Sequence, residues 1–154
     1  MGCRKMKQKN LWLLVGAPGS GKSTWAKQQD GAWISRDAIR FSMLHEGDHY
    51  FDHEDEVYKE FINQIQNALI SNENVYADAS HLNWSARNKL LTHLNLDGIN
   101  VNTVVFTTPL NVCFERNDTR TGRANVPHSV IRRMYYSFQH PKNDPFSYSV
   151  IKEI

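Results

Sequence analysis

Short apolar runs alternate along this chain with longer stretches in which apolar residues recur every three or four positions. The first run, NLWLLV at residues 10–15, stops at Gly16 and predicts a buried strand. Further short strands are expected at residues 32–35, 74–77, 101–107 and 148–154. Helical spacing predicts helices at residues 22–29, 36–44, 57–69, 85–96, 110–119 and 128–138. Because strands alternate with helices, we expect an α/β three-layer sandwich whose central parallel sheet has about five strands.

The composition is typical of one folded domain. The chain has 154 residues, of which 40% are hydrophobic, and a formal net charge of +2. The apolar run from Leu11 to Val15 is too short to span a bilayer. We therefore expect no membrane partner. Cys3 and Cys113 are too few for a disulfide framework, which favours a reducing cytoplasm. We expect a basic N-terminal tail at residues 1–9 and a single domain at residues 10–154.

The segment GAPGSGKS at residues 16–23 matches the phosphate-binding pattern G-x-x-x-x-G-K-[ST] between a predicted strand and a predicted helix. Its glycines let successive backbone N–H groups point at phosphate oxygens. Lys22 can reach the β- and γ-phosphates of ATP, and the Ser23 hydroxyl can hold Mg²⁺. The ATP-binding residues expected here are Gly16, Ala17, Pro18, Gly19, Ser20, Gly21, Lys22, Ser23 and Thr24.

This loop indicates a nucleoside triphosphate but leaves the reaction open. GTPases commonly read guanine with an Asn-Lys-x-Asp segment, and here Asn88-Lys89 is followed by Leu91 where the Asp should stand. A small kinase is therefore the leading class.

Two carboxylates follow predicted strands, at the sheet edge where open parallel sheets bind ligands. Asp37 is a candidate general base, and Arg40, three residues on, lies on the same helix face and can hold an acceptor phosphate. The alternative is that Asp37 caps its helix and Arg40 pairs with it. Asp78 stands where P-loop enzymes hold Mg²⁺ or its water and is also a candidate on the acceptor side; the alternative is a turn residue that ends a strand.

Three arginines surround a loop that contains Gly122 and ends at Pro127. Arg116 and Arg120, four residues apart, are expected on one face of their helix, and Arg123 follows. An arginine at the transferring phosphoryl group neutralises its charge, and the loop can close as a lid that excludes water. The alternative is a solvated basic helix face.

These motifs, in this order, resemble the 5′-kinase domain of phage polynucleotide kinases. The resemblance runs from GAPGSGKSTWA at 16–26 through ISRD at 34–37, Asp78 and the arginines to Val126-Pro127. It implies a P-loop kinase fold and ATP-dependent phosphoryl transfer to a 5′-hydroxyl of DNA or RNA, with Mg²⁺, in a bacterial or phage-infected host cell. It further implies nucleic acid repair as a context.

The resemblance also implies roles for single residues. They are Lys22 and Ser23 at the phosphates and metal, Asp37 as general base, Arg40 on the acceptor, Arg120 on the donor phosphates, and Arg116 and Val126 near the nucleotide base. We add Asp78 and Arg123 to the acceptor side, and Asp78 to the metal site, directly or through water.

Two other segments compete for attention. HEGDH at residues 45–49 matches the metalloprotease pattern H-E-x-x-H, and His53 extends the spacing, but Gly47 and Asp48 are poor helix formers and we expect an acidic loop. An incidental metal site there stays open. The segment RRMYY at 132–136 mixes charge with aromatic rings, and we expect the rings to be mostly core.

The leading hypothesis is therefore a polynucleotide 5′-hydroxyl kinase. One alternative is a P-loop kinase for a small-molecule hydroxyl such as that of a nucleoside or sugar, which predicts a closed acceptor pocket. A second alternative is a nucleotide-binding switch without transfer activity, in which Asp37 is dispensable.

Overall fold

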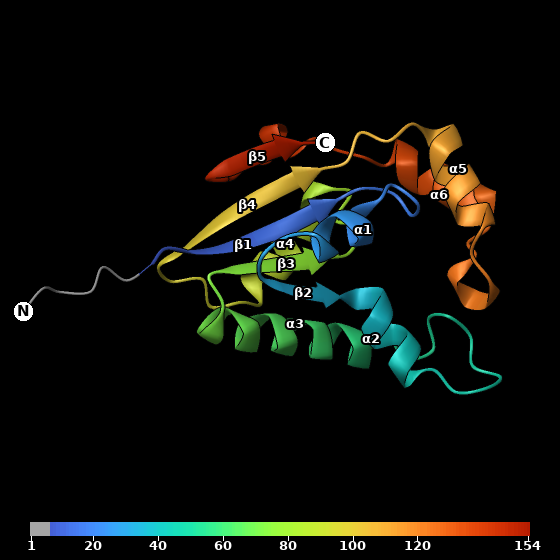
Figure 1. Ribbon diagram of the computed structural model, residues 1–154, viewed down its shortest axis with the longest axis horizontal. Coiled ribbons are helices and arrows are strands. Elements are labelled where there is room, and N and C mark those ends of the chain that lie inside the picture. The colour runs from blue at the N-terminus through green and yellow to red at the C-terminus, as the bar shows by residue number, and fades with distance from the viewer. Residues whose placement is uncertain (1–6) are drawn as a thin grey trace, which may run out of the picture.

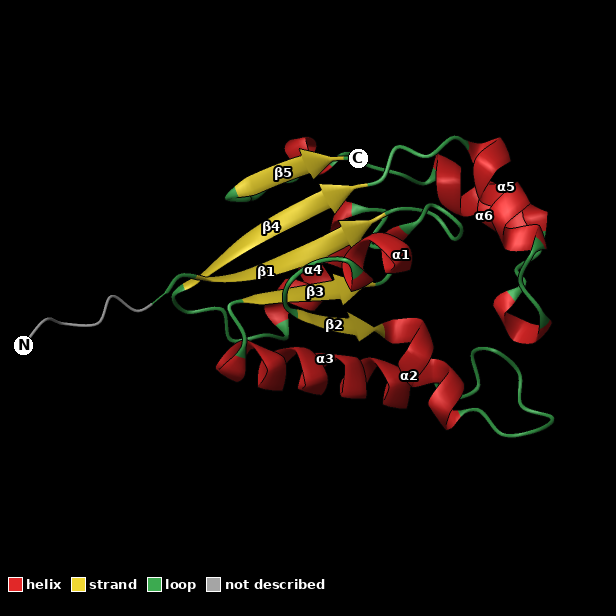
Figure 2. Ribbon diagram, in the orientation of Figure 1, coloured by secondary structure: helices red, strands yellow, loops and turns green. Residues whose placement is uncertain are grey.

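The computed structural model describes residues 7–154, and its core is a parallel sheet (Figures 1 and 2). The strands are β1 (Lys9–Val15), β2 (Ala32–Ser35), β3 (Asn74–Asp78), β4 (Ile99–Val105) and β5 (Val150–Glu153). They form one 5-stranded sheet in the order β2-β3-β1-β4-β5, and each neighbouring pair is parallel. The expected α/β fold with a central parallel sheet is confirmed.

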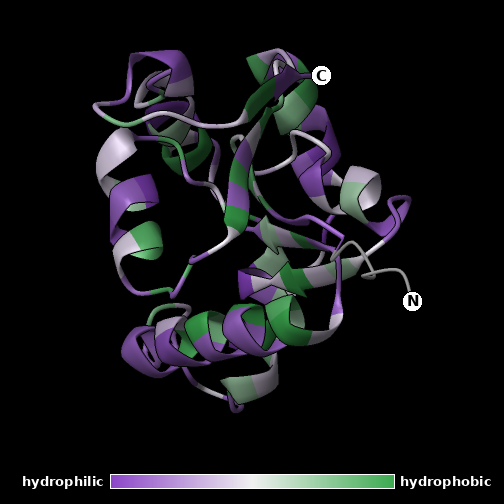
Figure 3. Cartoon of the chain, turned by 90° about the vertical axis from the view of Figure 1, so that its left-hand side faces the viewer, coloured by the Kyte–Doolittle hydropathy of each residue, from purple (hydrophilic) through white to green (hydrophobic). Residues whose placement is uncertain are grey.

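The helices lie between these strands in the chain. They are α1 (Lys22–Lys27), α2 (Arg36–Met43), α3 (Glu54–Ser71), α4 (Trp84–Thr92), α5 (Leu110–Asp118) and α6 (His128–Tyr136), with the 3₁₀ turns η1 (Gly122–Ala124) and η2 (Pro141–Asn143). Both apolar and polar positions recur along them, visible as green and purple bands in Figure 3. No helix in residues 7–154 is long and apolar enough to cross a bilayer.

Apolar packing on both faces of the sheet produces the three layers. Leu11 and Leu13 of β1 pack in one cluster with apolar residues of α2, α3 and α4. Leu14 of β1 belongs to a second cluster with Ala26 of α1. Because β1 is buried on both faces, its sequence is a continuous apolar run rather than an alternating one.

Several element ends differ from the predicted ones. The helix expected at residues 85–96 is α4, which ends at Thr92, and the strand expected at 101–107 is β4, which ends at Val105. Helix α3 begins at Glu54, three residues before its first apolar position, with Glu54, Asp55 and Glu56 in its first turn. Carboxylates near a helix N-terminus interact favourably with the positive end of the helix dipole. These acidic residues therefore stabilise a first turn that lies before the apolar stripe.

The expected basic tail is only partly described. Arg4 and Lys5 lie outside the described residues, as does Cys3. Lys7 is exposed and pairs with Glu73 at 3.2 Å, whereas Lys9 already belongs to β1. The boundary of the domain stays a prediction.

The expectation that the rings of 132–136 are core is wrong. Ile131 is the buried residue of α6, while Tyr136 keeps 73% of its surface exposed. Met134 and Tyr135 of this helix are half-buried.

Candidate active site

A cavity of about 790 Å³ lies at the carboxyl ends of β1, β2 and β3. The in-register pairing of Ser35 with Asp78 brings the ends of β2 and β3 to the same level. The strand order reverses at β1, and open sheets bind ligands at such points. The cavity wall contains these predicted site residues: Pro18, Gly19, Gly21, Lys22, Ser23, Thr24, Asp37, Arg40, Asp78, Arg120, Arg123 and Val126.

The phosphate-binding loop has the backbone that its glycines allow. Gly19 and Gly21 have φ values of 83° and 96°, which side chains rarely adopt. A Cβ atom on Gly19 would also lie 2.5 Å from the carbonyl oxygen of Cys113. Three residues of the loop, Gly16, Ala17 and Ser20, line a second cavity on the other side of the loop and do not line the first.

Lys22 folds back over the loop. Its Nζ donates hydrogen bonds to the carbonyl oxygens of Gly16 at 2.8 Å and Ala17 at 3.0 Å. Burial lowers the pKa of Lys22, and the charges of Asp78 and Asp37 oppose that shift. The ammonium thus lies against the carbonyl oxygens of the loop, and the two carboxylates favour its charged form.

Ser23 and Asp78 meet across the cavity wall. The Ser23 hydroxyl donates to Oδ2 of Asp78 at 2.6 Å, and Nε1 of Trp33 donates to the same oxygen at 2.9 Å. Asp78 is buried, with 5% of its surface exposed. A serine hydroxyl beside a carboxylate is an oxygen donor set that suits Mg²⁺. Sequence analysis did not find Trp33, whose indole holds the carboxylate in place.

Asp37 lies in the first turn of α2, and in the described part of the chain only one of its carboxylate oxygens is bonded to protein groups. Tyr50 donates its hydroxyl proton to Oδ1 at 2.7 Å, and Nη1 of Arg40 pairs with that same Oδ1. Within residues 7–154, no protein group hydrogen-bonds to Oδ2. Ser35, not Asp37, caps the helix, because its Oγ accepts from the backbone N–H of Ala38 at 3.1 Å. The capping alternative for Asp37 is therefore wrong, and the pairing with Arg40 is present.

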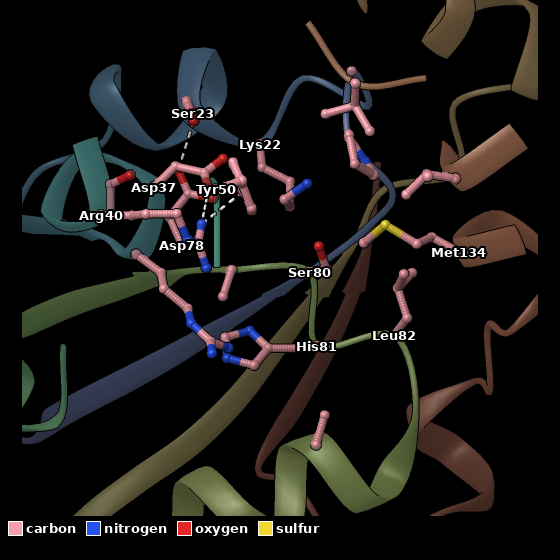
Figure 4. Close-up of a pocket in the computed structure, with 18 of the residues that line it drawn as sticks. Lys22, Ser23, Asp37, Arg40, Tyr50, Asp78, Ser80, His81, Leu82 and Met134 are labelled. Carbon is pink, nitrogen blue, oxygen red and sulfur yellow. Dashed lines mark hydrogen bonds and ion pairs between the residues drawn. The ribbon is translucent and has the colours of Figure 1, made fainter. Parts of the chain in front are cut away.

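Arg40 is buried and holds Asp37 against the start of α3. Its Nε donates to Oε2 of Glu54 at 3.0 Å, and its Nη1 also donates to the Tyr50 hydroxyl at 2.6 Å. Desolvation acts to lower the pKa of Arg40, but the hydrogen bond to Glu54 and the negative charges of Asp37 and Glu54 outweigh it and raise that pKa. Arg36 donates to Glu54 as well, at 2.7 Å. Figure 4 shows Asp37, Arg40 and Tyr50 gathered at one side of the cavity.

The lid arginines have separate positions. Arg116, in the last turn of α5, donates to the carbonyl oxygen of Gly19 at 3.4 Å. Helix α5 ends at Asp118, so Arg120 lies beyond it, and the expectation that Arg116 and Arg120 share a helix face is wrong. Arg123 donates to the carbonyl oxygens of Asp48 at 3.0 Å and His45 at 3.3 Å.

Asn117 organises the lid; Arg116-Asn117 is among the motifs that carry the family resemblance, but sequence analysis gave Asn117 no role. It is buried, its Nδ2 donates to the carbonyl oxygen of Val126 at 2.7 Å, and its Oδ1 accepts from the backbone N–H of Val126 at 2.9 Å. These two bonds fold residues 118–125 into a closed loop above the cavity. The Asn side chain follows Arg116 directly, so its position beside an arginine was the only available signal.

The acidic segment at residues 45–53 forms turns rather than a helix. His53 pairs with Asp48 at 3.0 Å, and no cluster of His, Cys, Asp or Glu suited to a metal ion occurs in the described part of the chain. The expected loop is confirmed. Its contribution to the site is Tyr50, which the sequence pattern did not indicate.

The comparisons with known proteins bear on the fold. An AAA domain family model matches residues 11–141. No curated protein matches the chain. Among solved structures, a chain of the Pnkp1/Rnl/Hen1 RNA repair complex has a TM-score of 0.75 at 24% identity, covering 94% of this chain and 48% of that one. The present chain thus spans about half of that protein's length.

Two further structures extend the likeness. A gluconokinase from Sinorhizobium meliloti 1021 has a TM-score of 0.57 at 22% identity, covering 97% of this chain and 83% of that one. Chaetomium thermophilum Kti12 in complex with ADP-AlF3 has a TM-score of 0.62 at 14% identity, covering 94% and 88%. These likenesses show the fold alone. The chain belongs to the AAA domain family and has the fold of a P-loop kinase.

Proposed function

We propose that this protein transfers the γ-phosphoryl group of ATP to the 5′-hydroxyl end of DNA or RNA. The order of motifs resembles the phage 5′-kinase domain, and a structural neighbour belongs to an RNA repair complex. The cavity wall contains six cationic side chains and three carboxylates, an excess of positive charge that suits a polyanionic acceptor beside ATP.

The observation that carries the proposal is the asymmetric hydrogen bonding of Asp37. Both donors, Tyr50 and Arg40, bind Oδ1. Oδ2 is then the atom that accepts the proton of the acceptor hydroxyl as its oxygen attacks the γ-phosphorus. The proton moves to Oδ2, a bond forms between the acceptor oxygen and phosphorus, and ADP leaves with the electrons of the broken P–O bond.

On the donor side we assign charge stabilisation to Lys22 and Arg120, which line the same cavity as Asp37. Because the transition state of phosphoryl transfer is loose, positioned cations do most of the work. Ser23 and Asp78 are the residues that would hold Mg²⁺, which when bound neutralises phosphate charge. Arg116, beside Gly19 and Gly21, and Val126 are assigned to the nucleoside end of ATP.

The geometry refines the acceptor assignments. All three guanidinium nitrogens of Arg40 donate to protein groups: Nε and Nη2 to Glu54, and Nη1 to Asp37 and Tyr50. This favours orientation of Asp37 over direct binding of an acceptor phosphate. The bonds from Ser23 and Trp33 favour the metal-side role for Asp78. Arg123, at the rim of the cavity, is assigned to closing the lid over the acceptor.

The test is end labelling. The protein is incubated with γ-labelled ATP, Mg²⁺ and 5′-hydroxyl single-stranded DNA, RNA, nucleosides and sugars, and labelled products are separated. We expect label on polynucleotide 5′ ends. Label on a free nucleoside or sugar alone would reject the polynucleotide assignment, and ATP hydrolysis without any labelled acceptor would favour the nucleotide-binding switch.

A small-molecule kinase is the second candidate, and one contact favours it. Arg123 of the lid bonds the backbone of the 45–53 loop across the top of the cavity, which narrows its entrance. A gluconokinase shares the fold over most of its length. The same acceptor screen distinguishes the two kinases.

A further inference from the structure

A second cavity, of about 380 Å³, lies behind the phosphate-binding loop and takes no part in the proposed chemistry. The backs of Gly16, Ala17 and Ser20 form one wall, and the end of β4 with Phe106 to Thr108 forms another. The remaining lining is Leu82, together with residues from the end of α6 and the chain that follows it: Tyr135, Tyr136, Phe138 and His140. Its volume is within the range of small-ligand pockets.

Two of the rings around this cavity are open to solvent. Tyr136 keeps 73% of its surface exposed and Phe138 keeps 40%. Tyr135 and Tyr136 meet edge to face with centroids 5.3 Å apart, and Phe138 meets His140 at 5.9 Å. Exposed aromatic side chains that border one hollow are typical of a binding surface rather than of chance exposure.

The charge around the rings selects the kind of ligand. No Asp or Glu lines the cavity, and Arg133, three residues before Tyr136 on the same helix, makes no ion pair within residues 7–154. Arg132 lies over the ring of Phe114 instead, 5.4 Å from its centroid. Two acidic groups of the described chain are near the rim, and both already have partners. Glu153 pairs with His140, and the terminal oxygen of Ile154 accepts hydrogen bonds from the hydroxyl and the backbone N–H of Thr107, each at 2.8 Å. Stacking rings with an unpaired guanidinium match a nucleobase and its phosphate backbone.

The second cavity adjoins the candidate active site. Leu82 lines both cavities, and α6 separates them, because Met134 and Ser137 line the first while Tyr135 and Tyr136 line the second. Figure 4 shows Leu82 and Met134 on the side of the active-site cavity opposite Asp37. A strand whose 5′ end lies at Asp37 and which runs past Leu82 therefore arrives at these rings.

We propose that this second cavity is a stacking site for a nucleobase of the single-stranded acceptor, located 3′ of the end that is phosphorylated. The proposal rests on the proposed function, because it gives the same acceptor a second point of attachment. It makes the enzyme prefer an oligonucleotide over a mononucleotide. The rings of Tyr136 and Phe138 provide the stacking, and Arg133 provides charge for the backbone.

The test compares acceptors of increasing length. The kcat/KM value is measured for a nucleoside 3′-phosphate and for 5′-hydroxyl single strands of two to eight nucleotides. We expect wild-type kcat/KM to rise with length, and Tyr136→Ala and Phe138→Ala each to remove about tenfold of that gain through KM. Both variants should leave the value for the nucleoside 3′-phosphate within about twofold.

Matched variants separate stacking from folding defects. Ile70→Ala removes a side chain on α3 that is also 73% exposed, and it should change kcat/KM for neither the oligonucleotides nor the nucleoside 3′-phosphate. Tyr136→Phe keeps the ring and should retain the length dependence. A single abasic nucleotide is placed at successive positions of the acceptor. At one of these positions it should lower the kcat/KM of the wild-type enzyme, and at that position it should not change the kcat/KM of Tyr136→Ala.

The outcomes distinguish this inference from the proposed function. Labelling of polynucleotide ends with no length dependence, or with Tyr136→Ala indistinguishable from wild type, overturns the stacking site alone. If no 5′ end is labelled, the proposed function is rejected. The stacking site is then tested separately, by the binding of a 3′-fluorescent oligonucleotide measured by anisotropy. Binding that Tyr136→Ala weakens supports the site, and no binding, or a dimer that Tyr136→Ala dissociates, overturns it.

Discussion

Two donors on one oxygen of Asp37 set the chemistry that this side chain can perform. A carboxylate with both oxygens bonded to protein would be a structural group, and one with neither would be free to rotate. Tyr50 and Arg40 bind only Oδ1, so Oδ2 keeps a defined direction. Burial, and next the nearby Asp37 charge, raise the pKa of Tyr50, so its hydroxyl stays a donor throughout the physiological range.

Replacement of this carboxylate tests the assignment. Asp37→Asn keeps the shape but cannot take a proton, so we expect kcat to fall by about 10²–10⁴ with ATP affinity within about twofold. Asp55→Asn makes the same chemical change in the first turn of α3, on an exposed side chain, and should leave kcat unchanged. Steady-state kinetics and ATP titration measure both; equal activity of Asp37→Asn and wild type would contradict the role of base.

His81 is the residue whose protonation is most constrained. It is buried, its Nδ1 lies 2.9 Å from the carbonyl oxygen of Leu14, and its φ of 46° is unusual for a residue with a side chain. Burial lowers the pKa of His81 to about 4, from an ordinary value of 6.5. At neutral pH the ring is therefore uncharged, with Nδ1–H donating to Leu14.

This depressed pKa predicts acid sensitivity. Between pH 6.5 and about 4 the unfolded chain takes up a proton on His81 that the folded chain refuses, so stability is complete above pH 6.5 and falls as pH decreases through that window. The loss attributable to His81 should be roughly 3 kcal/mol. His81→Asn, which tolerates the positive φ, should flatten the pH dependence of urea unfolding, whereas His93→Asn, on an exposed residue, should not. Identical pH slopes for His81→Asn and wild type would contradict the assignment.

At the scale of elements, the phosphate-binding loop shows how one backbone angle and one close neighbour combine. Gly19 needs a positive φ and also has no room for a Cβ beside Cys113 of α5. The phosphate-binding loop is therefore packed directly against the backbone of α5, the helix that precedes the lid. A sequence pattern identifies the glycine but not the neighbour that makes it necessary.

A pair of glycine variants separates these two effects. Gly19 and Gly47 have similar φ values, 83° and 87°, but a Cβ on Gly47 meets nothing within 4 Å. Gly47→Ala should cost about 1 kcal/mol of stability and leave ATP binding unchanged. Gly19→Ala should displace the loop and weaken ATP binding by at least about tenfold. Isothermal titration and thermal unfolding measure the two quantities; equal ATP affinity in the two variants would show that the contact with Cys113 is unimportant.

At the scale of the whole molecule, one buried ion pair joins distant parts of the chain. Arg87 of α4 is fully buried, and its Nη2 pairs with Oδ1 of Asp144 at 2.6 Å, while the Asp144 side chain is 1% exposed. Arg87 also donates to the backbone of His81 and Gln139, and Tyr148 donates to Asp144 at 2.6 Å. These bonds attach the segment between α6 and β5 to the body of the domain.

Breaking that pair should destabilise the fold as a unit. Arg87→Met leaves the Asp144 carboxylate buried without its charged partner, with only the Tyr148 hydroxyl, within residues 7–154, bonded to it, and we expect a loss of about 3–5 kcal/mol in the free energy of unfolding. Glu73→Gln breaks the exposed pair with Lys7 and should cost less than about 0.5 kcal/mol. Urea denaturation compares the two, and a loss below about 1 kcal/mol for Arg87→Met would show that the segment is held by other contacts.

The local pattern of this chain determined its elements, its parallel sheet and the loop that surrounds Lys22, because strand burial, helix periodicity and glycine backbone freedom are properties of neighbouring residues. It also placed Asp37 and Asp78 at strand ends. Only the tertiary structure decided how the site side chains are held. Tyr50 bonds Asp37, Glu54 bonds Arg40, and Trp33 bonds Asp78. These partners lie 13, 14 and 45 residues away, and no local periodicity encodes a contact that depends on how helices and loops pack around the sheet.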